Sequence, residues 1–510
     1  MTTPLSPRQT RWAVLTAALV FYLFLGWTVF YSPIDDWRWG IDSIGLDWWL
    51  NAVYNRRYAG NFFAVVMTRS VLAKTLIMGL HMFALPLLMA VIASRRDEKR
   101  FLPLFLACNA GLLLMSSYMW RETYYWVSGF GNFVIPTVYF LVWLLILDQL
   151  DRKRTHTFAW SPVLFLLTLF LGLFLENLTV LFFGASLILA IYSLWDRKLL
   201  LPFWACLLGT GAALFLMLFH GIYTDLIDAG TAIEGYRQLS FPPGSTLPEM
   251  AAGIFRQYGR LLSRSFVGGF HLALPLAVVI ARGFWSSRLR PACALAALPL
   301  ALAAVVGSNE SLANAPAATV ASVLSWALAV LAILLHQSER RVWISRLLLT
   351  LSAPLSLLFL SATNSEPWRS QFFAMSMLIL VAADLAAPLL TPSTGTALIG
   401  AAAVLLALRW GLPAGEAAAC TQLRQKLTRE AATSGAQTLI LPTDQHQYTL
   451  WAGRNPWAMN LANCFRQLNH LPTDLTVVFL PPGSFETWPE ISPAQWADRM
   501  EFGPSDEPVW

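Results

Sequence analysis

The sequence predicts an all-α polytopic membrane protein, with about thirteen transmembrane helices and a small α/β domain at its C-terminal end. The 510 residues are 56% hydrophobic and only 13% charged, whereas soluble domains carry about 25% charged residues. Long apolar runs recur along the chain, and the connections between them hold short clusters of Lys and Arg. The net charge of +6 lies in these clusters, so it does not indicate nucleic-acid binding.

A transmembrane helix needs about 20 predominantly apolar residues. Thirteen runs meet this requirement, at 12–31, 71–93, 101–118, 133–150, 159–175, 178–195, 199–219, 266–282, 291–307, 318–336, 346–362, 373–391 and 396–411. The fifth and sixth runs are separated only by a polar break at Glu176. This pair is therefore either two helices or one broken helix.

The positions of Lys and Arg predict the orientation of the chain in the membrane. Basic clusters lie at 95–100, 151–154, 196–198, 282–290 and 340–346, all on the same side as the N-terminus. Basic loops stay in the cytoplasm, so we expect the N-terminus there. The first run has no signal-peptide cleavage site and is expected to remain as an anchor. An odd number of spans then places the C-terminal domain outside the cell membrane.

The connections on the opposite side are longer and richer in acidic and aromatic residues. They comprise residues 32–70, 119–132, 220–265, 307–317 and 361–372, together with the turn at Glu176-Asn177. Polar motifs in a membrane protein are costly and tend to be functional. The sequence therefore predicts that any chemistry takes place on the outer face.

Asp35 and Asp36 are the most informative of these polar residues, because they directly follow the first apolar run. A carboxylate beside a membrane cavity is suited to deprotonating an acceptor hydroxyl group. The alternative is a solvated loop that caps the next helix. The sequence alone favours neither interpretation, and it does not decide which carboxylate would be the base, with a slight preference for Asp36.

A second motif follows the third apolar run and combines aromatic, basic and amide side chains. Arg121 is suited to bidentate binding of a phosphate, and Glu122 could orient it or serve as a second acid or base. Tyr124, Trp126 and Asn132 could position sugars. An aromatic belt at the membrane surface would explain the Trp and Tyr residues. It would not explain the charged and amide groups, so we favour a binding function.

Three other outer motifs are candidates for substrate binding. Glu176 and Asn177 interrupt an apolar stretch, although a tight polar hairpin would explain them equally well. Glu310 lies in the 307–317 connection. Glu366 and Arg369 flank a Pro-Trp turn, where Arg369 could bind a phosphate or both could form a surface ion pair of little energetic value.

The C-terminal region, 412–510, is more polar than the rest of the chain. Residues 417–432 are typical of an amphipathic helix, and 438–442 and 475–480 are typical of short buried strands. Cys420 and Cys464 lie in this region and could form a disulfide in an oxidising compartment, or remain two free thiols. The chain shows no metal-ligand spacing and no phosphate-binding glycine loop.

With Asp35 and Asp36 in its first outer loop, the chain resembles the GT-C class of membrane glycosyltransferases. Residues 125–132, Glu176-Asn177 and 455–460 resemble a little-characterised family of bacterial GT-C-like proteins, related in type to O-antigen-modifying glucosyltransferases. The resemblance implies a multi-pass protein of the bacterial inner membrane, with a GT-C-like transmembrane domain over 1–411 and a periplasmic domain over 412–510.

The same resemblance implies the substrates. The donor would be a polyprenyl-phosphate-linked sugar, and the acceptor a cell-surface glycan or a lipid-linked molecule. Asp35 or Asp36 would be the general base. Members of the class differ in their need for a divalent metal, so that requirement stays open. Two alternatives also stay open: a polysaccharide polymerase or ligase, and a flippase without chemistry, for which Asp384 and Glu176 would be the buried polar residues.

Overall fold

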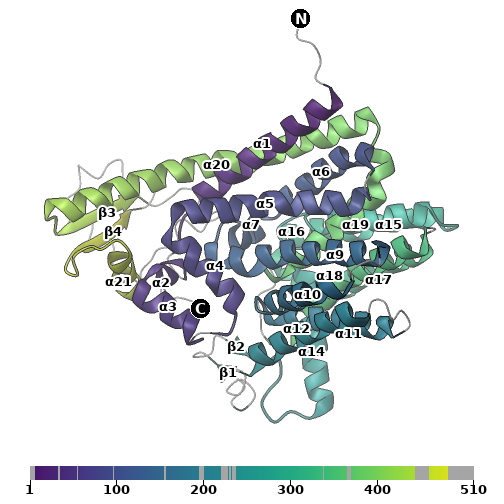
Figure 1. Ribbon diagram of the computed structural model, residues 1–510, viewed down its shortest axis with the longest axis horizontal. Helices are drawn as coiled ribbons and strands as arrows, with labels where there is room; N and C mark the ends of the chain where they lie inside the picture. The colour runs from purple at the N-terminus through teal and green to yellow at the C-terminus, as the bar shows by residue number, and fades with distance from the viewer. Residues whose placement is uncertain are drawn as a thin grey trace, which may run out of the picture.

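The structure is a computed structural model that is almost entirely helical. It describes residues 6–32, 35–53, 55–95, 97–153, 157–194, 200–219, 228, 231–232, 237–336, 338–363, 369–442 and 459–480. Within these residues, ten helical stretches are long and apolar enough to cross a membrane, and one bent pair makes an eleventh. Figure 1 shows most of them running along the long axis of the molecule. The multi-pass membrane prediction is therefore confirmed.

The first half of the bundle contains six of these stretches. They are α1 (Pro7–Thr28), α5 (Val71–Ser94), the bent pair α6 (Glu98–Leu113) and α7 (Ser117–Thr123), α8 (Val127–Gly129) continuing through the π-helix η1 (Phe130–Val134) into α9 (Ile135–Lys153), α11 (Glu176–Ser193) and α12 (Leu200–Leu218). The bend between α6 and α7 is 98°.

The second half contains the other five. They are η3 (Arg290–Ala296) with α16 (Ala297–Ser308), α17 (Pro316–Leu335), α18 (Arg340–Leu358) with η5 (Phe359–Ala362), η6 (Arg369–Gln371) with α19 (Phe372–Leu390), and α20 (Ser393–Ser434). Two shorter apolar helices, α10 (Thr157–Gly172) and α15 (Ala273–Trp285), occupy the predicted runs at 159–175 and 266–282. Every predicted run thus falls on an apolar helix, while the count of thirteen spans stays a prediction.

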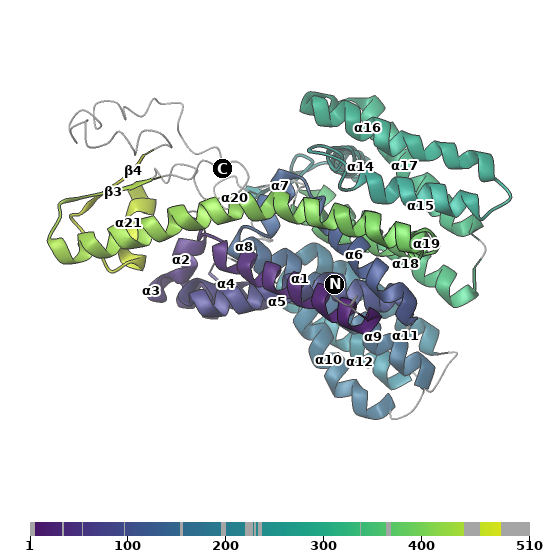
Figure 2. The ribbon, with the colours of Figure 1, turned by 90° about the horizontal axis from the view of Figure 1, so that it is seen from above.

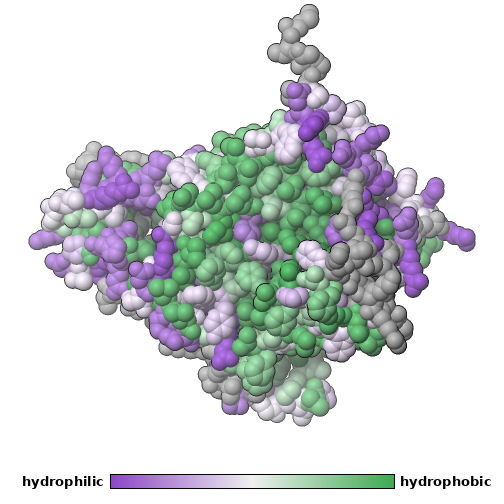
Figure 3. Space-filling model, in the orientation of Figure 1, coloured by the Kyte–Doolittle hydropathy of each residue, from purple (hydrophilic) through white to green (hydrophobic). Residues whose placement is uncertain are grey.

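The surface has the polarity expected of a membrane protein. Figure 3 shows a broad apolar area over the middle of one face, with hydrophilic side chains gathered toward the two ends. Large apolar side chains such as Leu166, Leu208 and Phe215 are exposed on the surface. Helix α5 begins at one end of the bundle and reaches the other end at Arg95, about 36 Å away at 1.5 Å per residue. We call these the Asp36 end and the Arg95 end.

Short elements gather at the Asp36 end. They are α2 (Asp36–Gly40), α3 (Asp42–Leu50), α4 (Tyr58–Arg69), α14 (Leu247–Arg264), η4 (Glu310–Asn314) and the antiparallel pair β1 (Thr231–Ala232) and β2 (Arg237–Gln238). All of them belong to connections that the sequence predicts on the outer face. Helix α14 stands across the direction of the membrane helices in Figure 1.

Helix α20 runs the length of the molecule beside α1 and continues beyond it (Figures 1 and 2). The left-handed residue Gly435, with φ of 68°, ends this helix. The strands β3 (Thr438–Pro442) and β4 (Thr476–Leu480) then pair in parallel, with α21 (Met459–Leu468) between them in sequence. Both strands lie where the sequence predicts them, and the predicted helix at 417–432 is the end of α20. The boundary of a separate domain at 412 stays a prediction.

The C-terminal unit, α21 with β3 and β4, shares a hydrophobic core with α2 rather than standing apart. The ring of Trp37 in α2 lies 5.1 Å from that of Phe465 in α21, and Leu439 and Leu475 are buried beside them. The Cys420 thiol donates to the carbonyl of Pro442 at 3.8 Å, and the structure contains no disulfide between Cys420 and Cys464.

Helices α1 and α5 are in close contact because Gly26 and Gly79 face each other. A Cβ atom added at Gly79 would lie 2.7 Å from the Cα atom of Leu23 and 3.0 Å from the carbonyl oxygen of Tyr22. Small residues commonly allow such close approach of membrane helices. This contact fixes the end of α1, from which the Asp35–Asp36 segment emerges.

We expect Gly79→Ala to destabilise the protein by about 1–3 kcal/mol, because the new methyl group must push α1 away from α5. Gly184→Ala is the matched control, since a Cβ there meets nothing within 4 Å. The measurement is the thermal unfolding temperature of both variants in detergent. Equal unfolding temperatures for the two variants would contradict the close contact.

Candidate functional site

The carboxylate of Asp36 is fully buried and joins three segments of the chain. Its Oδ2 accepts hydrogen bonds from the backbone N–H groups of Ser32, at 2.8 Å, and Val127, at 3.3 Å. Its Oδ1 accepts from the backbone N–H and the hydroxyl group of Ser128, at 2.9 and 2.5 Å. Asp36 therefore binds the N-terminus of α8 to the end of α1. All four hydrogen-bond donors to this carboxylate are backbone or side-chain groups of the protein itself.

Burial raises the pKa of Asp36 to about 7, even though the hydrogen bonds from Ser128 and Ser32 lower it. The buried ammonium group of Lys74 lies nearby and interacts electrostatically with Asp36. It donates to the carbonyls of Trp27, at 3.2 Å, and Val29 at the end of α1. Lys74 and Asp36 together hold the exit of α1 in one conformation.

Asp35 has a different environment from its neighbour. It is half-buried, and the positive charges of Arg369, Arg38 and Arg57 act on its carboxyl group. Burial raises the pKa of Asp35, and the three arginines oppose that increase. These arginines come from η6, from α2 and from the residue before α4. Asp35 is thus a half-buried residue whose carboxyl group lies among cations from three separate segments.

Arg369 links this carboxylate to the aromatic motif. Its guanidinium carbon lies 5.2 Å from the ring centroid of Trp126 and 5.9 Å from that of Phe133. A cation over an aromatic face at this distance is attracted by the ring. The fold thus brings together Asp35, Trp126 and Arg369, three predicted site residues that are far apart in sequence. Glu366 lies outside the described residues.

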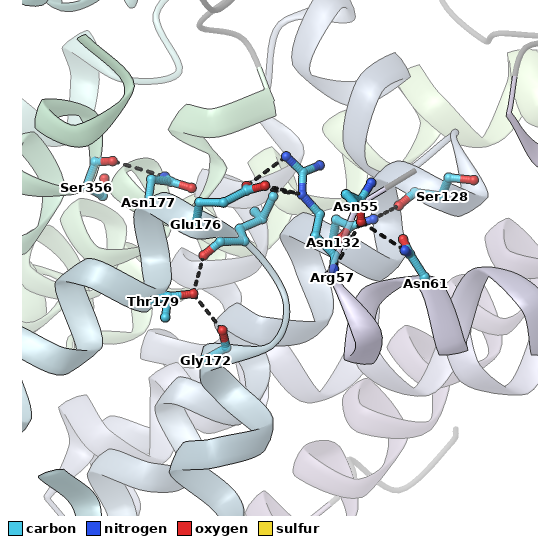
Figure 4. Close-up of polar contacts among 11 residues, drawn as sticks. Asn55, Arg57, Asn61, Ser128, Asn132, Gly172, Glu176, Asn177, Thr179 and Ser356 are labelled. Atoms are coloured by element: carbon cyan, nitrogen blue, oxygen red, sulfur yellow. Dashed lines mark hydrogen bonds and ion pairs between the residues drawn. The ribbon is translucent and has the colours of Figure 1, made fainter. Parts of the chain in front are cut away.

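Arg57 forms a bidentate ion pair with Glu176 at the start of α11. Its Nη2 lies 2.8 Å from Oε2, and its Nε lies 3.2 and 3.1 Å from the two carboxylate oxygens. Figure 4 shows the two side chains facing each other. The Asn55 side chain accepts from the backbone N–H of Arg57 at 3.0 Å and from the Asn61 amide at 2.9 Å. This network orients the guanidinium group that acts on Asp35.

Asn177 and Asn132 hold the neighbouring helices in place. The Asn177 amide donates to the carbonyl of Ser356 in α18 at 3.0 Å. The Asn132 amide donates to the carbonyl of Ser128 at 2.9 Å, inside the π-helix η1, and packs against Gly60. Its Oδ1 is buried and has no hydrogen-bond partner among the described residues. Short π-helical turns occur frequently at functional sites.

Four predicted residues lie in other surroundings. Arg121 pairs with Glu122 at 3.6 Å and lies over the ring of Tyr118, whose hydroxyl group is hydrogen bonded to Glu310. These four side chains form a second polar cluster around α7. Tyr124 is fully buried, with its ring 5.1 Å from that of Trp120. It belongs to the hydrophobic core.

The sequence analysis missed Arg38, Arg57, Asn55 and Lys74. Arg56-Arg57 within the first outer connection was a usable signal, because a charged pair in a predicted outer loop is unusual when the basic clusters lie inside. Lys74 was another, because it lies near the start of an otherwise apolar run. Their proximity to Asp35 and Asp36 could be seen only in three dimensions.

No group of three or more His, Cys, Asp or Glu side chains that could hold a metal ion occurs in the part of the chain that the structure describes. Comparison of the chain with protein-family models, with curated proteins and with solved structures found no match.

The raised pKa of Asp36 predicts how stability depends on pH. Between about pH 4 and pH 7 the folded protein holds a proton on Asp36 that the unfolded chain has released. The free energy of unfolding should therefore fall as the pH rises through this range, by at most about 4 kcal/mol from this group. Asp36→Asn should remove this contribution to the slope and leave the contribution of Asp35, whose pKa burial also raises.

The measurement is the unfolding temperature in detergent between pH 4.5 and 7.5. Asp47→Asn is the control, because that carboxylate is exposed in α3 and bonds only its neighbour Asn51 among the described residues. An Asp36→Asn curve as steep as the wild-type curve would contradict the assignment.

The pair of Arg57 and Glu176 should contribute measurably to stability. In a double-mutant cycle of Arg57→Met and Glu176→Gln, we expect a coupling energy of about 1–3 kcal/mol, since the Glu176 carboxylate is largely removed from water. The reference is Arg69 with Asp42, a pair whose carboxylate is 83% exposed. There we expect less than 1 kcal/mol. Equal coupling in the two cycles would contradict the structural role of the buried pair.

Proposed function

We propose that the protein is a membrane glycosyltransferase of the GT-C type. In this proposal it transfers a sugar from a polyprenyl-phosphate-linked donor to a glycan or a lipid-linked acceptor, on the periplasmic face of the bacterial inner membrane. The Asp36 end of the bundle would be that face. The observation that carries the proposal is the half-buried residue Asp35, on whose carboxyl group the charges of Arg38, Arg57 and Arg369 act, at one end of a bundle of apolar helices.

The charges of this cluster fit the reaction. Guanidinium groups bind phosphate oxygens through charge-assisted and bidentate hydrogen bonds. A phosphate placed against the three arginines would lie close to the Asp35 carboxylate. The aromatic face of Trp126, over which Arg369 lies, would contact the sugar. The exposed apolar surfaces of the surrounding helices would accommodate the polyprenyl chain.

In the transfer step, Asp35 takes the proton of an acceptor hydroxyl group. The hydroxyl oxygen attacks the anomeric carbon of the donor sugar, and a new glycosidic C–O bond forms. The bond between the anomeric carbon and the phosphate oxygen breaks, and polyprenyl phosphate leaves with the electron pair. The arginines stabilise the negative charge that develops on the departing phosphate. Asp35 then returns its proton to solvent.

Asp35 suits the role of base better than Asp36. Asp36 is fully buried, and the four hydrogen bonds it accepts from Ser32, Val127 and Ser128 occupy both of its oxygens. Asp35 keeps part of its surface exposed next to the arginines. We therefore assign catalysis to Asp35 and the support of its loop to Asp36.

We expect Asp35→Asn to lower the rate of sugar transfer by about 10²–10⁴-fold, because it removes the general base. The unfolding temperature should change little. The measurement is transfer from a synthetic polyprenyl-phosphate sugar to an acceptor glycan, with the purified protein in detergent. Asp42→Asn is the matched control, since Asp42 belongs to the same connection and its side chain is 83% exposed.

The control should keep the wild-type rate, whereas Asp36→Asn should lose stability as well as activity. Transfer by Asp35→Asn at the wild-type rate would overturn the assignment of the base. The absence of any transfer by the wild-type protein with a range of such donors would overturn the proposed function.

A further inference from the structure

A second charge cluster, in which the side chains of Asp384 and Arg346 are buried, lies at the Arg95 end of the bundle, far from the proposed active site. Asp384 of α19 accepts hydrogen bonds on one oxygen, Oδ2, from Arg95 and from Arg346, both at 2.7 Å. Arg282 of α15 lies beside them and donates from Nε to the carbonyl of Leu385 at 3.2 Å. The cluster therefore joins the end of α5 to α15, α18 and α19.

Positive charge is in excess in this cluster. Arg95 and Arg346 both pair with the carboxylate of Asp384, and Arg282 lies on the carbonyl of the next residue, Leu385, which makes three guanidinium groups to one carboxylate in this cluster of described residues. The charges of these four residues also act on the ring of His336. Burial, assisted by the arginine charges, lowers the pKa of His336 to about 4, so its ring is neutral at pH 7 and adds no charge. The cluster thus carries a net charge of about +2.

The arginines are held in place with much of their donor capacity unused. Each of them donates through one nitrogen, and their other guanidinium nitrogens have no hydrogen-bond partner within the described chain. The side chain of Arg346 is only 10% exposed and that of Asp384 only 8%. Arg95 also has a left-handed backbone, with φ of 49°. That conformation costs roughly 1–2 kcal/mol for a residue with a Cβ atom.

An incompletely neutralised group of buried charges is unfavourable unless a counter-ion completes it. We propose that this cluster is a binding site for a phosphate group, contributed by an anionic phospholipid headgroup or by free phosphate. Arg95, Arg282 and Arg346 would donate to the phosphate oxygens, and the carboxylate of Asp384 would compete with the phosphate for Arg95 and Arg346.

The location of the cluster favours the lipid as the source of the phosphate. Arg95 lies at the end of a 24-residue apolar helix, which is where the headgroups of one membrane leaflet would be. Basic pockets between membrane helices are typical sites for anionic headgroups on the cytoplasmic side. The charge pattern of the sequence predicts that the Arg95 end is cytoplasmic. The site does not depend on the proposed glycosyltransferase activity.

The test measures binding of phosphatidylglycerol to the purified full-length protein in a neutral detergent, by native mass spectrometry. Phosphatidylcholine is the zwitterionic comparison, and inorganic phosphate is added as a competitor. We expect phosphatidylglycerol to bind at least tenfold more tightly than phosphatidylcholine. Competition by inorganic phosphate would identify the phosphate group alone as the ligand, and its failure to compete would identify the lipid.

Three variants test the residues. Arg282→Gln keeps both ion pairs of Asp384 intact, so it should fold, and we expect it to weaken binding at least tenfold. Asp384→Asn removes the internal carboxylate and should strengthen binding, provided that its unfolding temperature shows a folded protein. Arg288→Gln is the matched control, because Arg288 belongs to the same basic connection, 282–290, and is exposed.

The control should bind as the wild type does. Two results would overturn the proposal: equal binding of the anionic and zwitterionic lipids by the wild type, or equal loss of binding in Arg282→Gln and Arg288→Gln. Either result can be read without any assay of sugar transfer, so it leaves the proposed activity untouched.

Discussion

The hydrogen bonds to the buried carboxylate of Asp36 are the interaction on which the outer end of the molecule depends. They join the segment after α1 to the first residues of α8. A buried carboxylate that lost these donors would be strongly destabilising, so the geometry of both segments is fixed together. The position of Asp35, one residue away, and the position of Trp126, one residue before Val127, both follow from this junction.

The C-terminal unit reinforces the same junction from the other side. Trp37 follows Asp36 in α2 and packs on Phe465 of α21, while the guanidinium group of Arg424 in α20 lies 4.7 Å from the ring of Phe30. Helix α20 must therefore extend well past the apolar bundle to bring this unit to α2, which explains its length of 42 residues. The loop that bears the candidate base is thus enclosed between the membrane helices and the C-terminal unit.

Composition and spacing were sufficient to predict the helical membrane architecture, because runs of about 20 apolar residues are typical of membrane-spanning helices. The short strands of the C-terminal unit were predictable for a similar reason, since small apolar segments bounded by Pro and Gly favour strands. The roles of Asp35 and Asp36 were not predictable. Two adjacent carboxylates have the same sequence signature, and only the positions of Val127 and Ser128 distinguish the buried one.

Likewise, the sequence showed Arg369 and Trp126 as separate motifs, because the fold alone determines which distant loops meet. Arg121 illustrates the converse. Its neighbours in sequence favoured a phosphate ligand, and in the structure it lies against Tyr118 and pairs with Glu122, so its role as a phosphate ligand stays a prediction. A motif identifies a residue type suited to a task, while the tertiary contacts decide whether that side chain is directed to the site.

The charge of the proposed site also bears on how strongly the transition state of the proposed reaction is stabilised. Arg38, Arg57 and Arg369 lie against the carboxylates of Asp35 and Glu176, which leaves one net positive charge when both acids are ionised. A polyprenyl-phosphate sugar is a phosphodiester with one negative charge, whereas the departing polyprenyl phosphate is a monoester that gains further charge. Fixed cations stabilise the more highly charged species more strongly, so they favour the transition state over the bound donor. In the proposed reaction, proton uptake by Asp35 would remove one carboxylate as the phosphate gains its charge, which would keep the site close to neutral throughout the transfer.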